Sequence, residues 1–388
     1  DRLRSRGLGD VYKRQGMKKI LHISKYYYPY AGGIEDVCYN VVRIIQEHTE
    51  FRQKVICFND SRKTVYDSWE GIQVIRVGVV SKVASQALSW KYGKELKKLL
   101  RDFQPDCIHF HAPNPFVAFL LLQLIPQKCK LIVHWHSDII AQKYLYTCIR
   151  PVEKALLQRA DIVVATSSAY AEKSLPLQPY REKLKIIPNM IDPHKFVFTE
   201  EVKKQVQKIK VAYREKPLLL FVGRHVPYKG LAYLIKGSVG IHPECEILIG
   251  GQGPLTPILK QQCISPNVHF IGKIPAEELV AYYYAADIFV FPSITKNEAF
   301  GVVLAEAMYC YTPAITFTIE GSGVNWVNLH QVTGLEVENG NVALLVKAIN
   351  DLLENEAQRL QYAQQAHNRV ERLFCIENVA AEIVGLYA

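Results

Sequence analysis

Two cations stand five residues apart on one loop in the second half of the chain. Arg224 and Lys229 belong to the segment Val-Gly-Arg-His-Val-Pro-Tyr-Lys-Gly, which follows an apolar run of strand type. Arginine makes two-pronged contacts with phosphate oxygens and lysine makes a point contact, so this pair can hold a diphosphate without a metal ion. The alternative is that both are solvated surface cations.

Two carboxylates follow another apolar run. Glu298 lies in the expected loop and Glu306 in the expected helix, which should begin near residues 300–302. Eight residues at helical rise span about 12 Å, comparable with the reach from a nucleotide ribose to its sugar. One carboxylate could bind sugar hydroxyls and the other ribose, while the amides of Phe300, Gly301 and Val302 bind phosphate. Alternatively, Glu298 is only a helix-start acid and Glu306 lies on a solvated face.

The first half of the chain offers a glycine turn. Gly32 and Gly33 follow a short apolar run and precede a stretch of helical spacing, so backbone amides there could face an anion. The spacing is not the G-x-G-x-x-G of dinucleotide folds. A tight structural turn explains the glycines equally well.

Histidines form two alternating pairs, His109 with His111 and His134 with His136. His136 comes where an expected strand ends, which makes it a candidate for contact with a substrate. No carboxylate or cysteine is spaced with the four, and the chain has no Asp-x-Asp motif, so we predict no metal site. A structural role for these histidines remains the alternative.

Alternating strands and helices position these residues. The first half predicts strands at 19–24, 53–58, 72–77, 107–111, 130–134, 162–166 and 185–187, and helices at 34–45, 91–103, 116–124 and 150–158. The pattern restarts with strands at 217–223, 246–250, 268–272, 288–291 and 314–316. The fold class is therefore α/β, with two doubly wound parallel sheets. Ligands bind at the carboxyl ends of such strands, so two facing domains would form a cleft there.

The expected domains are 17–190, 191–375 and a C-terminal helix, 376–388, that packs back on the first domain. Residues 1–16 are interpreted as an artefact, because Asp-Val-Tyr-Lys-Arg-Gln at 10–15 matches a reading frame of a sequencing adapter. A basic arm that binds an anionic partner is the alternative for this segment.

Charge and cysteine content limit the function classes. Residues 17–190 hold 25 Lys/Arg and 15 Asp/Glu, whereas residues 191–388 hold 17 and 20. The basic half is expected to meet something negative, although solubility alone tolerates such asymmetry. Nine dispersed cysteines without a C-x-x-C pair indicate a reducing cytoplasm, and no apolar run is long enough to span a bilayer.

Several segments together resemble glycosyltransferase family four: Gly32-Gly33-Ile34-Glu35, His136, Ile187 to Asp192, Val222-Gly223-Arg224 with Lys229-Gly230, Gly251-Gln252-Gly253-Pro254, and Glu298 to Met308. The motifs occur in the family's order and cover all of 17–388. The resemblance implies the GT-B fold and a retaining, metal-independent enzyme that needs no cofactor. It implies that Arg224 and Lys229 hold the donor diphosphate, with Gly33 beside the phosphates. Glu306 would bind ribose, and Glu298, the amides near Phe300-Gly301, and His136 would bind the sugar.

The sequence departs from the family pattern at two places. Gly321-Ser322-Gly323 and the residues after it replace the usual Gly-Gly-x-x-Glu, and Gln252 stands where an acidic residue is usual. The first variant is similar to rhamnosyl- and mannosyltransferases of O-antigen or capsule assembly, which makes GDP-mannose a guess for the donor.

The resulting prediction is a cytoplasmic hexosyltransferase that uses a nucleotide-sugar donor and a lipid-linked saccharide acceptor, and binds no nucleic acid. A basic stretch, 82–101, with Trp90 and the leucines Leu88, Leu96, Leu99 and Leu100 could lie on an anionic membrane surface, or be an ordinary solvated helix. A sugar-nucleotide epimerase, a phosphorylase and a non-catalytic saccharide-binding protein remain open.

Overall fold

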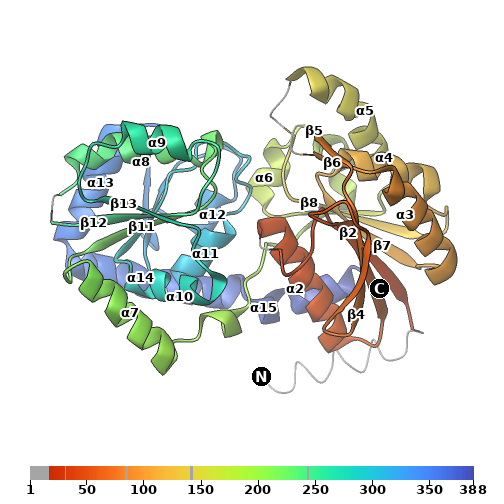
Figure 1. Cartoon of the computed structure of the whole chain (residues 1–388), viewed down its shortest axis with the longest axis horizontal. Coiled ribbons are helices and arrows are strands. Elements are labelled where there is room, and N and C mark those ends of the chain that lie inside the picture. Colours follow the sequence, from red (N-terminus) through yellow and green to blue (C-terminus); the bar gives the residue numbers. More distant parts are fainter. Residues whose placement is uncertain (1–16, 31, 84–85, 140–142, 243) are drawn as a thin grey trace. The chain divides into compact units, whose positions relative to one another are not determined.

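The computed structural model describes residues 17–388 except 31, 84–85, 140–142 and 243 (Figure 1). The chain divides into two compact units, one that ends at Met190 but takes in Ile376–Ala388, and one that comprises Ile191–Cys375. Residues 1–16, interpreted above as an artefact, lie outside the described residues.

The first unit is built on an eight-stranded sheet in the order β10-β9-β8-β7-β1-β2-β4-β3. Its strands are β1 (Lys19–Ile23), β2 (Arg52–Phe58), β3 (Val65–Trp69), β4 (Ile72–Val77), β7 (Cys107–Ala112), β8 (Lys130–Trp135), β9 (Ile162–Ala165) and β10 (Leu184–Ile186). Its helices are α2 (Gly33–His48), α3 (Trp90–Phe103), α4 (Pro115–Leu124), α5 (Lys143–Arg159), α6 (Ser168–Lys173) and α15 (Ile376–Gly385). A small hairpin, β5 (Ser81–Val83) and β6 (Gln86–Leu88), precedes α3.

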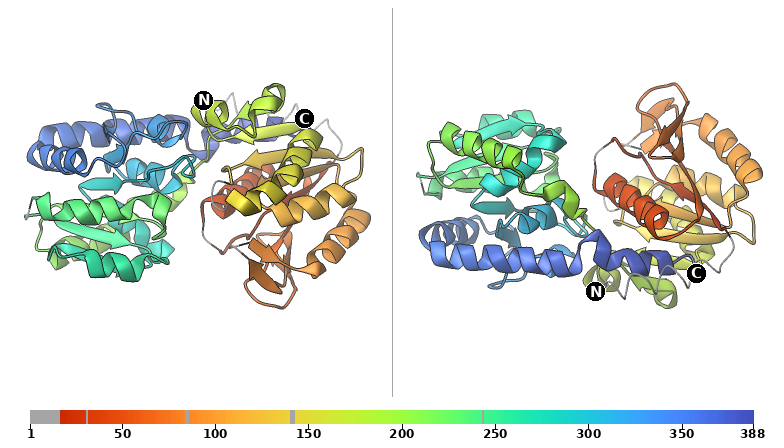
Figure 2. Two further views of the ribbon diagram at one scale, coloured as in Figure 1. Left: turned by 90° about the horizontal axis from the view of Figure 1, so that it is seen from above. Right: turned by 90° about the horizontal axis from the view of Figure 1, so that it is seen from below.

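Helices α2 and α15 pack together on one face of this sheet (Figure 2). Val37 and Val41 of α2 and Ile383 of α15 share a buried cluster with Ile20 and Ile132 of the strands. The C-terminal helix is amphipathic and buries its apolar side here, which explains why it belongs to the first unit although it is last in sequence.

Several elements of the first unit differ from the sequence-based expectation: the strands β3, β5 and β6 and the helix α6 were not predicted, and α5 is longer than predicted. The edge strand β3 is antiparallel to β4, and its side chains are mostly exposed or half-buried, so no apolar run marks it. Helix α5 begins at Lys143 and contains Pro151. The sequence-based prediction covered only 150–158. Proline is disfavoured inside a helix, so Pro151 gives no sequence signal for the helical turn that precedes it.

The second unit has a six-stranded, all-parallel sheet in the order β13-β12-β11-β14-β15-β16. Its strands are β11 (Leu218–Val222), β12 (Glu246–Gly250), β13 (Val268–Gly272), β14 (Ile288–Phe291), β15 (Ala314–Phe317) and β16 (Gly334–Val337). Its helices are α7 (Glu200–Ala212), α8 (Leu231–Gly237), α9 (Thr256–Gln262), α10 (Ala276–Ala285), α11 (Val302–Tyr309), α12 (Val324–Val327), α13 (Val342–Glu354) and α14 (Glu356–Leu373). Continuous apolar runs such as Leu-Leu-Leu-Phe-Val in β11 are typical of parallel strands buried on both faces.

Strand order reverses once in each sheet. From β11 the chain builds outward through β12 and β13, and it then returns to the other side of β11 as β14. From β1 it adds β2, then the edge strand β3, then β4 between them, and it returns to the other side of β1 as β7. Ligands of open α/β sheets bind at the carboxyl ends of the strands at such reversals. The loops after β11 and β14, and those after β1 and β7, are therefore the places to look for chemistry.

The lysine-rich helix α7 packs on α10 of the second unit. Val202, Val206 and Ile209 lie against the core of that unit. Lys210 forms an ion pair with Asp287 at 3.3 Å. Among the described residues, no helix is long and apolar enough to cross a bilayer.

The packing of α15 can be tested with a buried and an exposed substitution on the same helix. We expect Ile383→Ala to lower the free energy of unfolding by about 2–4 kcal/mol, because it removes a fully buried side chain. Glu382→Ala, on the exposed side, should change it by less than about 0.5 kcal/mol. Urea unfolding measures both, and equal effects would contradict the packing.

Candidate active site

Lys229 is buried at the carboxyl end of β11, in a short turn formed by Pro227–Lys229. Its Nζ forms an ion pair with Oε2 of Glu298. The side chain of Lys229 is only 10% exposed and that of Glu298 only 12%. The ammonium also lies 4.8 Å from the centre of the Phe291 ring. A buried charge needs such compensation, and the carboxylate and the aromatic ring supply it at the strand reversal.

Gly230 fixes this turn against the neighbouring strand end. Its φ is +63°, and a Cβ there would meet the carbonyl oxygen of Pro292 at 1.8 Å. Two residues after Pro292, the amide of Ile294 donates to the carbonyl of Tyr228 at 2.9 Å. The loops after β11 and β14 are thus joined through their backbones, which brings Lys229 and Glu298 together.

Glu298 is oriented by two serines that the sequence analysis did not identify. Ser293 donates to its Oε2 at 3.3 Å, and Ser322 donates to its backbone carbonyl. Ser322 lies in the Gly-Ser-Gly segment that departs from the family pattern. The departure therefore has a structural role, because it anchors the loop that carries the carboxylate.

Arg224 is exposed on the same loop as Lys229. Both contribute to the electrostatics of Tyr228: burial raises the pKa of its phenol, the charges of Lys229 and Arg224 lower it, and Glu298 raises it. Tyr228, which the sequence analysis also missed, thus marks the point where the predicted cations and one predicted carboxylate converge.

Helix α11 begins at Val302, within the expected range. Its N-cap residue is Gly301, with φ +86°, which has no side chain to cap the first turn. Phe300 contributes only its backbone here, because its ring packs edge-on against Trp326 and Phe374. Uncapped amides at a helix start carry partial positive charge and can bind an anion.

Glu306 lies one turn further along α11 and is half-buried. Tyr283 of α10 donates to its Oε2 at 2.8 Å. This bond fixes the carboxylate, and sequence could not reveal it because the two residues come from different helices.

In the first unit, α2 begins at Gly33, after Gly32 in extended conformation. A Cβ on Gly32 would meet the Glu35 carboxylate at 2.4 Å, and Glu35 and Asp36 both lie in the first turn of the helix. The expected anion position therefore already has negative charge beside it. An incoming phosphate would have to displace the flexible end of Glu35.

His136 follows β8 and is 6% exposed. Its Nε2 lies 2.9 Å from Nδ1 of His111, at the carboxyl end of β7. Burial and the neighbouring His134 hold the pKa of His136 well below its usual range, so the ring is neutral near pH 7.

Buried histidines raise the question of a metal. Two groups have ligand atoms within 4.8 Å of one another: His22 with Cys38 and His111, and His109 with His111 and His134. In the second group the three ring planes lie within 10–19° of parallel. A tetrahedral ion needs lone pairs that converge, whereas those of parallel rings do not, so this group favours stacking over metal binding.

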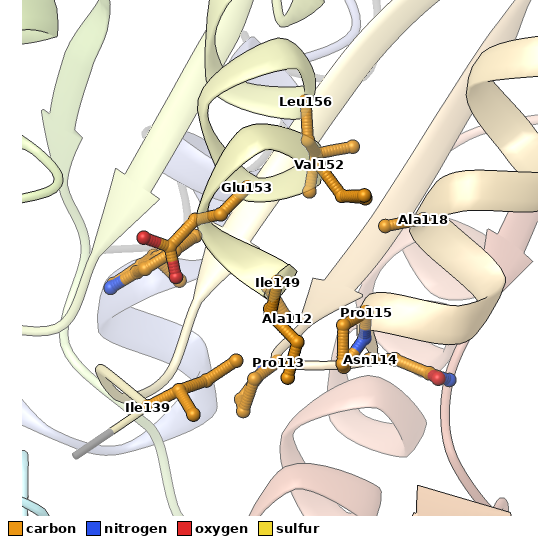
Figure 3. A pocket seen from close by; sticks show the side chains of 11 residues that line it. Ala112, Pro113, Asn114, Pro115, Ala118, Ile139, Ile149, Val152, Glu153 and Leu156 are labelled. Atoms are coloured by element: carbon orange, nitrogen blue, oxygen red, sulfur yellow. The ribbon is translucent and has the colours of Figure 1, made fainter. Parts of the chain in front are cut away.

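A small pocket lies beside β7 and β8, between α4 and α5 (Figure 3). Its space for water-sized molecules is about 20 Å³, and its walls include Pro113, Pro115, Val152 and Leu156. Glu153 also lines the pocket, and Tyr146 donates to its carboxylate at 2.8 Å. The pocket is too small for a sugar and offers no cation for a phosphate.

Comparisons with known proteins agree with this geometry. Residues 31–195 match the family model described as "Glycosyltransferase Family 4", and residues 202–369 match "Glycosyl transferases group 1". The O-antigen chain mannosyltransferase C of Escherichia coli is 30% identical over 95% of this chain and 98% of its own length.

The chain is a family 4 glycosyltransferase. It is similar over 92% of its length to the D-rhamnosyltransferase WbpZ of Pseudomonas aeruginosa, again at 30% identity. The solved structure of Anabaena HepE in complex with UDP-glucose superposes with a TM-score of 0.77 over 95% of this chain and 99% of that one, at 18% identity. The GT-B fold with two Rossmann-like sheets, expected from the sequence, is thereby confirmed, and the enzyme is a hexosyltransferase.

Two glycines of this glycosyltransferase allow a test of the backbone contact between the loops after β11 and β14. Gly230 and Gly272 both have positive φ, but a Cβ on Gly272 would meet nothing within 4 Å. Gly272→Ala should therefore lower the free energy of unfolding only by the cost of placing an alanine in the left-handed conformation, about 1–2 kcal/mol. Gly230→Ala should lower the free energy of unfolding markedly more, because the added methyl collides with Pro292.

Chemical denaturation of the two variants side by side measures this difference. Equal losses of stability would show that the close approach between Gly230 and Pro292 does not hold the loops together.

Proposed function

We propose that this glycosyltransferase transfers a hexose from a nucleoside diphosphate sugar to a saccharide on a lipid carrier, in the synthesis of a bacterial surface polysaccharide. The buried Lys229–Glu298 pair at the strand reversal carries the proposal. The printed names of the two relatives, an O-antigen mannosyltransferase and a D-rhamnosyltransferase, support a hexose of the manno series, with GDP-mannose as the first donor to test.

The proposed donor site uses fixed charges and no metal. Lys229 and Arg224 bind the diphosphate, together with the amides of residues 300–302, and Glu306 accepts hydrogen bonds from the ribose. Ser293 holds Oε2 of Glu298, and Oε1 accepts hydrogen bonds from hydroxyls of the sugar. His136 also contacts the sugar. In the free enzyme Lys229 is neutralised by Glu298, so the diphosphate competes for its Nζ. Gly32 and Gly33 contribute amides near the phosphates once Glu35 moves aside.

Retention of configuration is part of the proposal. The acceptor hydroxyl attacks the anomeric carbon from the face that the diphosphate leaves, through an oxocarbenium-like ion pair. The departing phosphate oxygen takes the acceptor's proton, so the new glycosidic bond forms as the old one breaks. The two cations and the start of α11 stabilise the charge that develops on the leaving diphosphate.

The reaction is tested by incubating the purified protein with GDP-mannose and with UDP-sugars, each with and without a lipid-diphosphate saccharide. We expect an extended saccharide that retains its anomeric configuration, formed only with acceptor. Conversion of donor without acceptor would indicate an epimerase, transfer from a sugar phosphate would indicate a phosphorylase, and binding without turnover would indicate a saccharide-binding protein.

The role of Lys229 predicts a large catalytic effect. At saturating donor, Lys229→Ala should lower turnover by at least about a hundredfold, because one preorganised cation is lost from the leaving group. Lys236→Ala, which removes an exposed lysine on the following helix α8, is the matched control and should leave turnover unchanged. Circular dichroism checks that both are folded, and near-normal turnover of Lys229→Ala would refute the role.

We propose further that the enzyme works in the cytoplasm, at the inner face of the membrane. All nine cysteines are free thiols, eight of them buried or half-buried, which suits a reducing compartment. Helix α3 is the proposed contact with anionic lipid. Its leucines Leu96, Leu99 and Leu100 are buried in the protein, so they cannot enter lipid as the sequence suggested.

What α3 exposes is charge and one aromatic ring. Lys94, Lys97, Lys98 and Arg101 are exposed, and Trp90 at its start is 73% exposed. Docking would therefore be mainly electrostatic, with Trp90 as an interfacial anchor, and should weaken as salt screens the charges.

Charge reversal tests the membrane contact. The triple variant Lys94→Glu, Lys97→Glu, Lys98→Glu should lose co-sedimentation with phosphatidylglycerol vesicles. The matched control reverses three exposed lysines of α7, Lys203, Lys204 and Lys208, and should still bind. Binding that is equal in both variants, or that persists on neutral phosphatidylcholine vesicles, would contradict docking through α3.

A further inference from the structure

Five histidines line one face of the first sheet at the carboxyl end of three adjacent strands. They are His22 on β1, His109 and His111 on β7, His134 on β8 and His136 directly after β8. None is more than 6% exposed. On the same face, the amino-terminal halves of these strands carry apolar residues such as Ile20 and Ile132. Imidazoles replace aliphatic side chains only near the strand ends.

The rings form an ordered stack. His109 lies over His111 with centres 4.7 Å apart, and His134 lies over His136 at 4.4 Å, each pair within 10° of parallel. Two edge-to-edge contacts cross from β7 to β8. One joins Nδ1 of His111 to Nε2 of His136 at 2.9 Å, and the other joins Nε2 of His109 to Nδ1 of His134 at 3.3 Å.

The rings are neutral, and their proton positions are therefore linked. Burial lowers the pKa of His111 and of His136 well below the usual range, and neighbouring imidazoles lower both further. A neutral imidazole has one N–H and one lone pair. If His136 donates from Nε2 to His111, its own Nδ1 must carry the lone pair. If His111 donates instead, Nδ1 of His136 must carry the hydrogen.

His22 favours the first arrangement. Gln53 donates its amide to the carbonyl of Val42 at 3.1 Å, so its Oε1 accepts from Nε2 of His22 at 2.9 Å. The remaining nitrogen of His22, Nδ1, therefore carries a lone pair. His22, Cys38 and His111 form a group whose ligand atoms lie within 4.8 Å of one another, and Nδ1 of His22 and Nε2 of His111 are buried without a hydrogen-bond partner in the described chain. A lone pair nearby favours the hydrogen of His111 on Nε2, which leaves its Nδ1 to accept from His136.

Nδ1 of His136 is buried and has no hydrogen-bond partner within the described chain. An unpaired buried nitrogen of this kind costs free energy that a ligand hydroxyl would recover. With the arrangement above, this nitrogen is an acceptor at the strand end.

We propose that His111 is a positioning residue that holds His136 as the Nε2–H tautomer, so that Nδ1 accepts a hydrogen bond from a hydroxyl of the donor sugar. The contact with the sugar rests on the proposed function, whereas the tautomer is a property of the free protein. His111 itself does not touch the sugar in this proposal.

The chain supplies an internal control. Tyr387, after α15, contacts Nδ1 of His109 through its hydroxyl. His109 belongs to the other edge-to-edge pair, in which its Nε2 faces His134. Tyr387→Phe removes a buried hydrogen bond to the same stack but leaves the His111–His136 bond in place. A general loosening of the stack would appear in this variant as well.

The first experiment is NMR of protein labelled with [15N]histidine, with His136 assigned by its loss in His136→Asn. We expect the wild type and Tyr387→Phe to show His136 with hydrogen on Nε2 only. His111→Phe keeps the ring volume but cannot accept, so His136 should show averaged shifts of two tautomers. His111→Asn places an amide oxygen near the position of Nδ1 and should restore the Nε2–H form. A tautomer that is unchanged in His111→Phe, or hydrogen on Nδ1 in the wild type, would overturn the proposal.

The second experiment is a double-mutant cycle on sugar transfer. His111→Phe should lower kcat by about tenfold, with His111→Asn within about threefold of wild type. Because His111 acts only through His136, the double variant His111→Phe, His136→Phe should be no slower than His136→Phe alone. Additive losses would contradict the proposal. If the wild type transfers no sugar at all, the proposed function fails, and the NMR result still decides the role of His111.

Discussion

The ion pair between Lys229 and Glu298 is the interaction on which the donor site depends. It joins two loops that leave neighbouring strands at the reversal of the second sheet, and both partners are largely withdrawn from water. Removing one partner of such a pair leaves an uncompensated buried charge. The pair also keeps the site neutral until a ligand arrives. In the proposed donor complex a diphosphate takes over the ammonium of Lys229, while Ser293 still holds Oε2 of Glu298 and Oε1 binds the sugar.

The two units supply different chemistry at equivalent places in their sheets. At its strand reversal, the second unit presents cations, a carboxylate and an uncapped helix start. The first unit presents neutral imidazoles, which burial prevents from becoming charged. In the proposed function, the cations of the second unit stabilise the leaving group, and the neutral imidazoles of the first unit accept hydrogen bonds from the sugar hydroxyls. This division explains why the basic excess of the first half does not appear among its candidate site residues, and why its exposed lysines are assigned to lipid instead.

Much of the fold could be predicted because buried parallel strands are continuous apolar runs, and β11 and β14 stand out on that ground. The fold and the family are confirmed, and the start of α11 fell within the expected range. The edge strand Val65–Trp69 could not be found, because its side chains are all exposed or half-buried and leave it without an apolar signature. Helix α5 was expected too short, at 150–158, because the interior Pro151 gives no sequence signal for the turn before it.

Candidate site residues could be selected by their position after strand ends, but their partners could not. Ser322 reaches Glu298 and Tyr283 reaches Glu306 across more than 20 residues of sequence, and each contact depends on how separate elements pack. The bond between His111 and His136 is of the same kind. Sequence showed both alternating histidine pairs, but only the register of β7 with β8 places the two rings edge to edge.

The central claim is that fixed protein cations hold the donor diphosphate without a divalent ion. Calorimetric titration of the wild-type enzyme with GDP, UDP and ADP, in EDTA and again with Mg²⁺ or Mn²⁺, tests it directly. The account predicts that at least one nucleotide binds with the same affinity in all three conditions. Binding that appears only when a divalent ion is present would contradict it.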